Sequence, residues 1–171
     1  MRGAPDHSRN RQNFRWELGP EVQNGRMLLM TAALMAQAFL ALPVDGITCD
    51  QAEGVVQHVH AHLAIYDRGK PVSIPAGVGI NNPAQCLYWL HTHAGDGIIH
   101  IEAPVARVFT VGNFLDIWDH DIGWKRPVVL VDGKRWKGGD FRSIPLLDHE
   151  QIVIENVPPF IAPPSVNWHG L

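Results

Sequence analysis

Large apolar residues or alanine recur at every second position of the stretch HVHAHLAI, residues 58–65, with histidine between them up to residue 62. An alternation with a period of two is typical of a β-strand with one buried face. The Asp67–Gly69 segment supplies a turn, so residues 55–80 are expected to form a strand, a turn and a second strand. The residues expected on the buried face of the first strand are Val59, Ala61, Leu63 and Ile65.

The pattern changes further along the chain. Residues 84–93 and 97–104 are expected to form two short strands on either side of the turn AGDG. Residues 110–121 then follow a helical period, and Thr110 is available as the N-cap. The apolar positions that share one face of this predicted helix are Val111, Phe114, Leu115 and Trp118.

Two or three more strands are expected after the helix. Residues 127–136 predict a strand that ends in an Asp-Gly turn, which is a strong hairpin signal. Residues 144–157 contain the last strand, and residues 158–171 form a proline-rich tail. One helix on one face of a small mixed β-sheet is an α+β arrangement, and the element order looks like a β-grasp domain. A small β-barrel or sandwich with one helix is the alternative.

A long apolar run lies near the N-terminus, at residues 27–42, and follows a polar tail of residues 1–26. The run has the length of a signal-peptide core and falls short of the roughly 20 apolar residues of a full membrane span. The five arginines of the tail favour a cytoplasmic location for that side. We therefore predict a signal peptide or membrane anchor at residues 27–43, with an exported domain at residues 44–157.

Two other interpretations of the apolar run stay open. The natural start could be Met27 or Met30, in which case the preceding residues are not native. The run could also be an amphipathic helix of the domain core, but it is apolar on nearly all faces, which favours export or anchoring. If the run is an anchor, the membrane is a partner of the protein through residues 27–42.

The composition is that of a globular protein. The chain has 171 residues, 46% of them hydrophobic and 18% charged, which suits one ordinary domain with tails. The formal net charge is −3 without any block of Lys or Arg, which argues against nucleic-acid binding. If the domain is exported, Cys49 and Cys86 would form one disulfide. In a reducing cytosol both would stay thiols, and Cys86 would become a candidate metal ligand.

Six of the ten histidines fall in two short windows, residues 58–62 and 91–102. Alternate Cα atoms of a strand are about 6.5–7 Å apart, so two neighbouring histidines of one face can share an ion bound at about 2.0–2.1 Å. The ends of a three-histidine set, about 13 Å apart, cannot share it. A single site with ligands from both windows is one outcome, and two adjacent sites are another. The candidate metal ligands are His58, His60, His62, His91, His93 and His100.

Two acidic residues in the second window are candidates for supporting roles. Glu102 would share a strand face with His100 and could orient the ligands or, if the protein is an enzyme, act as a general base. Asp96 could also orient a ligand, although an aspartate between two glycines is typical of a turn.

Ligand chemistry limits the choice of metal. Imidazole-rich sites with a carboxylate suit Cu(II), Zn(II), Ni(II) or Fe(II). All four methionines lie at or before position 35, which excludes a methionine-based Cu(I) site in the domain. We expect a transition metal, copper or zinc in the first place, with iron or nickel as alternatives.

Several functions are compatible with these clusters. The leading hypothesis is an extracytoplasmic, non-enzymatic metal-binding protein. A small hydrolytic or oxygen-using metalloenzyme is the second. An interaction module whose histidines sense pH is the third, with an unknown protein partner. Histidines that merely make the exposed face of an antiparallel sheet polar are the structural alternative.

The motifs resemble those of a known family. The stretches HAHLAIY, IPAGVGI and CLYWLHTHAGDGIIHIEAP are similar to the HxHAHLxI and CxYWLHTHxxxGIIHIE patterns of a family of uncharacterised bacterial exported or membrane-anchored proteins. Ala103 departs from the serine that is common at its position. The resemblance covers most of residues 45–155 and implies export, a histidine site, and that Cys49 and Cys86 act together. It leaves the reaction open.

Overall fold

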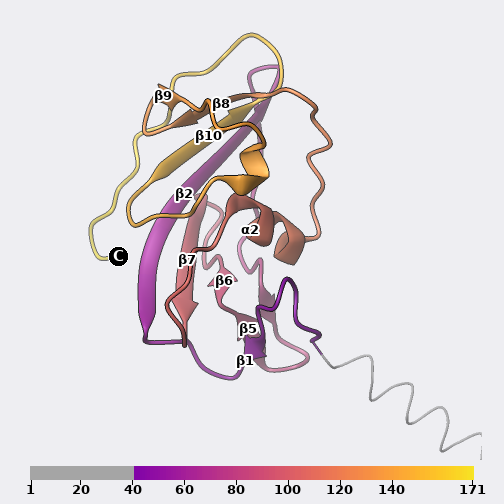
Figure 1. Ribbon diagram of the computed structural model, residues 1–171, viewed down its shortest axis with the longest axis vertical. Helices are drawn as coiled ribbons and strands as arrows, with labels where there is room; N and C mark the ends of the chain where they lie inside the picture. Colours follow the sequence, from indigo (N-terminus) through magenta and orange to yellow (C-terminus); the bar gives the residue numbers. More distant parts are fainter. Residues whose placement is uncertain (1–40) are drawn as a thin grey trace, which may run out of the picture. The chain divides into compact units, whose positions relative to one another are not determined.

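The computed structural model describes residues 41–171 of the chain (Figure 1). The polar tail and nearly all of the predicted signal or anchor run, residues 1–40, lie outside the described residues. From residue 41 onward, no helix is long and apolar enough to cross a membrane.

The larger of two sheets has seven strands within residues 41–171. Their order is β6-β7-β2-β10-β8-β9, and β3 also pairs with β2. The central strands β2 and β10 are parallel, and the other pairs are antiparallel. The strands are β2 Gln57–Asp67, β3 Lys70–Val72, β6 Leu90–His91, β7 Ile98–Ala103, β8 Val128–Val131, β9 Lys134–Arg135 and β10 Gln151–Glu155.

One helix, α2 (Val111–Trp118), covers this sheet (Figure 1). Thr110 is its N-cap, as predicted, because its side chain accepts a hydrogen bond from the backbone N–H of Asn113. The Asn113 side chain accepts one in return from the Thr110 backbone, so two free N–H groups of the first turn are satisfied. The helix ends at Asp119, whose backbone is left-handed at φ 54°.

The mixed sheet with a single helix confirms the predicted α+β class. In this open sheet the long strand β2 lies parallel to the last strand, β10, at the centre, as in the β-grasp-like order that the sequence predicted, so the barrel or sandwich alternative does not apply. The β8–β9 hairpin turns at Asp132 and Gly133, which both have positive φ angles, as a two-residue hairpin loop requires. A short 3₁₀ helix, η1 (Phe141–Ser143), precedes β10. Residues 158–171 contain no helix or strand.

A second, three-stranded sheet was not predicted. It has the order β1-β5-β4, with β1 Cys49–Asp50, β5 Cys86–Tyr88 and β4 Ile80–Asn81. The single strand expected at residues 84–93 is therefore wrong: it breaks at Trp89 into β5 and β6, which belong to different sheets. The strand expected after the first turn is also shorter, because β3 ends at Val72.

A disulfide joins Cys49 of β1 to Cys86 of β5 and holds the small sheet together. Such a bond persists in oxidising compartments, so it indicates an extracytoplasmic environment. Cys86 is consequently not a thiol ligand for a metal.

Candidate metal centre

The register of three neighbouring strands brings the two histidine windows together. His60 of β2 and His91 of β6 both lie opposite His100 of β7, so three histidines form one row across the sheet. His58 lies opposite Glu102 in the same way. Directly opposed residues of an antiparallel pair have Cβ atoms about 4.5–5.5 Å apart, which places these side chains within reach of one another.

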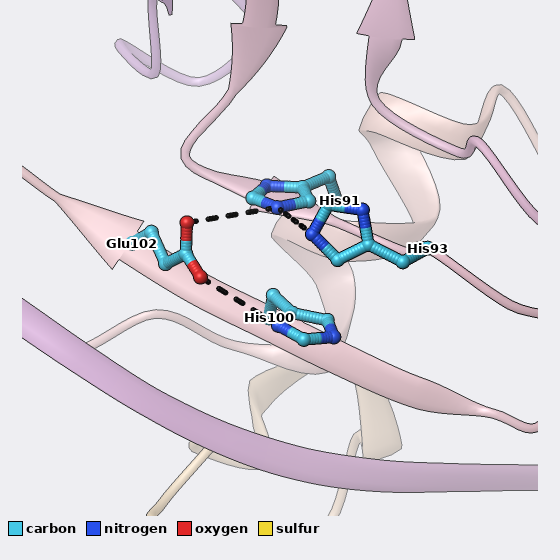
Figure 2. Close-up of side chains that lie close together, drawn as sticks. All are labelled: His91, His93, His100 and Glu102. Atoms are coloured by element: carbon cyan, nitrogen blue, oxygen red, sulfur yellow. Dashed lines mark hydrogen bonds and ion pairs between the residues drawn. The ribbon is translucent and has the colours of Figure 1, made fainter. Parts of the chain in front are cut away.

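Three of these side chains converge with that of His93, which lies just after β6 (Figure 2). His91, His93, His100 and Glu102 each offer one donor atom, and all four atoms lie within 4.8 Å of one another. The Nε2 atoms of His91 and His93 are 3.2 Å apart. Donors bound at about 2.0–2.1 Å in a tetrahedron are about 3.3–3.4 Å from one another. The His91–His93 pair already has the spacing that a tetrahedral ion needs, and the other donors would have to move closer on binding.

His91 is held in a defined orientation. Its side chain is fully buried, and its Nδ1 lies 3.0 Å from the backbone carbonyl oxygen of Tyr88. Because a carbonyl only accepts hydrogen bonds, Nδ1 must carry the proton, which leaves the Nε2 of the neutral ring free to coordinate. That Nε2 is 3.8 Å from Oε2 of Glu102. A histidine that donates its other N–H to a backbone carbonyl is the usual arrangement of a metal ligand.

Glu102 carries a buried carboxyl group, and one of its two oxygens lacks a hydrogen-bond partner. It is 5% exposed, and its Oε2 has no hydrogen-bond partner. Burial raises the pKa of Glu102, and the negative charge of Glu53 raises it further. A cation beside Oε2 would supply the missing partner and favour the ionised form.

Glu53 is a neighbour of the site that the sequence did not reveal. It lies in the loop before β2, and its Oε1 is 4.0 Å from Nε2 of His93. A backbone hydrogen bond from Gly54 to the carbonyl of Glu102 fixes this loop against β7. No motif marks Glu53, because only the folded loop brings it close.

A second group shares Glu102. His58 and His60 each offer a donor atom near the carboxylate, again within 4.8 Å of one another. Nε2 of His58 lies 3.2 Å from Oε1 of Glu102, and Nε2 of His60 lies 3.1 Å from Nδ1 of His100. Residues from both windows thus lie close together, but the four-residue group draws on the second window alone, whereas the sequence led us to expect one site with ligands from both.

Two of the candidate residues lie outside both groups. His62 is buried opposite Ile98, and its Nδ1 has no hydrogen-bond partner. This agrees with the expectation that the ends of the triplet are too far apart to share an ion. Asp96 is exposed, and its side chain accepts a hydrogen bond from the backbone of Ile98 at 3.1 Å, so it forms the turn before β7.

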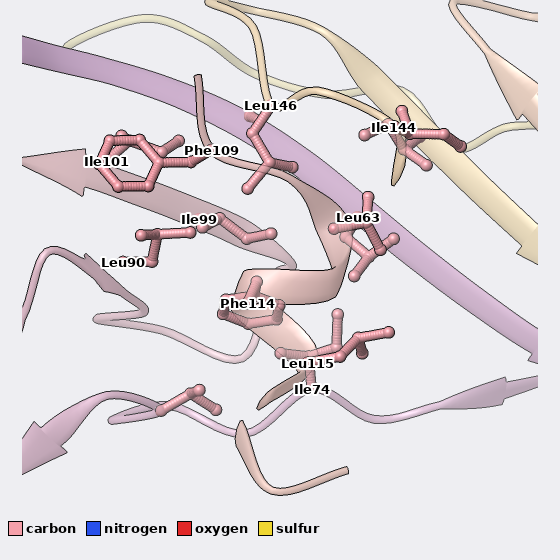
Figure 3. Packing of buried hydrophobic residues seen from close by; sticks show 14 of the residues in the cluster. Leu63, Ile74, Leu90, Ile99, Ile101, Phe109, Phe114, Leu115, Ile144 and Leu146 are labelled. Carbon is pink, nitrogen blue, oxygen red and sulfur yellow. The ribbon is translucent and has the colours of Figure 1, made fainter. Parts of the chain in front are cut away.

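The reverse face of the same strands forms part of the hydrophobic core (Figure 3). Leu90, Ile99 and Ile101 alternate with the site residues and are 0% exposed. Phe114 of α2 belongs to the same buried cluster. The donors are therefore mounted on strands whose other side is fixed by close packing.

Burial also favours the uncharged form of three histidines of the two groups. It lowers the pKa of His60 and His91, and it lowers that of His100 to about 4, with the neighbouring histidines adding to the effect. Neutral imidazole is the form that binds a metal, so these rings need not lose a proton before coordination at pH 7.

The metal-free protein is expected to show this directly in a histidine titration followed by NMR. The His100 ring should titrate near pH 4, well below the ordinary value of 6.5. Because the unfolded chain takes up this proton below about pH 6.5 and the folded domain does not, the free energy of unfolding should fall as the pH drops from 6.5 towards 4. A His100 pKa near 6.5 would contradict the packing described here.

Comparisons of the chain with protein-family models, curated proteins and solved structures found no match.

Proposed function

We propose that the domain is an extracytoplasmic metal-binding protein that holds one copper or zinc ion at His91, His93, His100 and Glu102. One observation carries this proposal: four donor atoms from two strands and the following loop converge around a buried carboxylate oxygen that has no other partner. In native proteins, most buried side-chain oxygens have a hydrogen-bond partner or another polar partner.

The donor set supports copper or zinc over harder cations. Three imidazoles and one carboxylate suit Zn(II) and Cu(II), whereas calcium and magnesium prefer oxygen ligands. Four protein donors fill a tetrahedral coordination sphere, which is the arrangement of a site that holds its ion. A catalytic site would keep one position open for water or substrate. This favours metal holding over metalloenzyme chemistry at this group.

Two observations support a location outside the cytoplasm. The Cys49–Cys86 disulfide requires an oxidising compartment during folding. The resemblance of the histidine motifs to those of exported bacterial proteins points the same way.

Elemental analysis of the full chain, purified without an affinity tag, tests the proposal. We expect about one equivalent or more of copper or zinc in the wild-type protein. His91→Gln should lose the ion of this site, because it removes the ligand whose orientation is fixed by Tyr88. His169→Gln, which changes an exposed histidine outside both groups, is the matched control and should bind as wild type does. A protein that takes up no copper, zinc, nickel or iron would refute the proposal.

A further inference from the structure

The two oxygens of Glu102 lie nearest to different histidines, and Nδ1 of His100, in the four-residue group, is also 3.6 Å from Oε1. Oε2 lies 3.8 Å from Nε2 of His91, in the four-residue group. Oε1 lies 3.2 Å from Nε2 of His58, in the group of β2. A carboxylate with one oxygen towards each of two donor sets has the geometry of a bridge between two ions.

The β2 backbone at His60 is fixed by residues outside the first group, while the His60 ring contacts Nδ1 of His100 at 3.1 Å. The backbone of His60 is fixed by the loop before β10, because the His149 N–H donates to its carbonyl at 2.7 Å. The Asp148 side chain accepts a hydrogen bond from the His60 N–H at 3.3 Å. His60 is 5% exposed, whereas the His58 side chain is 59% exposed, so one side of this group opens to solvent.

A single ion cannot use all of these donors. A tetrahedral ion takes four ligands, and His91, His93, His100 and one oxygen of Glu102 already supply them. His58, His60 and the other oxygen of Glu102 then remain as three unused donors close together. Carboxylate-bridged metal pairs in proteins have their ions about 3.5–4 Å apart, a separation that one carboxylate can span.

We infer that the domain binds a second transition-metal ion through His58, His60 and Oε1 of Glu102, so that Glu102 bridges a pair of ions. This inference rests on the proposed function of the first group. With three protein donors, the second ion has a position left for water on the side where His58 is exposed.

The number of bound ions and their magnetic coupling test the inference. Full-length, metal-free protein is titrated with Cu(II) in equilibrium dialysis, and the loaded protein is examined by electron paramagnetic resonance. We expect two equivalents of Cu(II) and the signature of two interacting ions, including a half-field transition. The His58→Gln/His60→Gln variant should bind one equivalent and give the signal of an isolated Cu(II) ion. His169→Gln should match wild type.

The outcomes separate the two proposals. One equivalent in the wild type, with no change in the double variant, overturns the second site and keeps the first. No Cu(II) or other metal bound at all refutes the proposed function itself. Because His60 is buried, the double variant could misfold, so the single variant His58→Gln is measured as well. The His58 side chain is mostly exposed, and its loss should leave the fold intact. We expect His58→Gln to bind the second equivalent at least tenfold more weakly and the first equivalent as wild type does. A second equivalent of unchanged affinity in His58→Gln also overturns the inference.

Discussion

The Glu102→Gln variant is expected to lose metal binding while its metal-free form stays as stable as wild type or becomes more stable. The amide has no negative charge and is a poor metal ligand. Replacing a residue that only supports a metal ligand lowers the metal affinity roughly 10–100-fold. Replacing the ligand Glu102 itself should lower the affinity for the first ion by at least this factor. Titration calorimetry with zinc measures this loss.

The stability of the metal-free variant follows from the raised pKa of Glu102. The folded domain binds the Glu102 proton more tightly than the unfolded chain, whose ordinary pKa is 4.5. The stabilisation that this provides is complete below about pH 4.5 and is lost as the pH rises through the higher, folded value. Above that folded value the ionised carboxylate is a burden on the metal-free fold, and the neutral amide relieves it.

Glu150→Gln is a matched control for this experiment. Burial raises the pKa of Glu150 as well, and its Oε2 is likewise buried without a partner, yet it lies outside both donor groups. Thermal unfolding at pH 7 and pH 4 should show the same direction of change in both metal-free variants. Only Glu102→Gln should affect metal binding. An unchanged zinc affinity in Glu102→Gln would remove this carboxylate from the site.

Loss of the disulfide is expected to have the largest effect on the fold itself. The bond closes a loop with a sequence separation of 37 residues. Restricting such a loop in the unfolded chain contributes roughly 4 kcal/mol to the free energy of unfolding. The Cys49→Ser/Cys86→Ser variant should lose about this amount in urea denaturation of the metal-free protein. Reduction of the wild type should lower stability to the same extent.

The same variant should also bind metal less tightly. Cys86 begins β5, and the carbonyl of Tyr88 at the end of that strand fixes the His91 ring. A β5 strand released from β1 holds that carbonyl less firmly, so His91 is less well oriented for coordination. A loss of stability below about 1 kcal/mol, with unchanged metal affinity, would show that the small sheet is held by its hydrogen bonds alone.

Features that depend on neighbouring residues could be predicted from the sequence. The alternation in residues 58–65 predicted β2, the helical spacing after Thr110 predicted α2, and Asp132-Gly133 predicted the hairpin turn. The order of these elements was sufficient for the α+β class. Each of these signals is local, because side-chain direction and turn geometry are set within a few residues.

Features that depend on pairing between distant segments could not be predicted. The break at Trp89 arises because β5 pairs with β1 and β6 pairs with β7, and no local pattern records either partner. The row of His60, His100 and His91 depends on register across three strands. The alternation of β2 separated histidine and apolar faces, but it did not indicate that His60 would be buried. His60 hydrogen-bonds to Asp148 in the loop before β10, almost ninety positions further along the chain, and its ring packs on His100 of β7.

The alternation along β7 has a consequence for how this domain can change over evolutionary time. Ile99, Ile101 and Ala103 are completely buried, while His100 and Glu102 between them point to the donor groups. Along this short strand, the side chains that pack in the core alternate with the side chains of the donor groups. Substitutions at His100 and Glu102 change the donor groups and leave the apolar face of this strand intact. Substitutions at odd-numbered positions act first on the yield of folded protein.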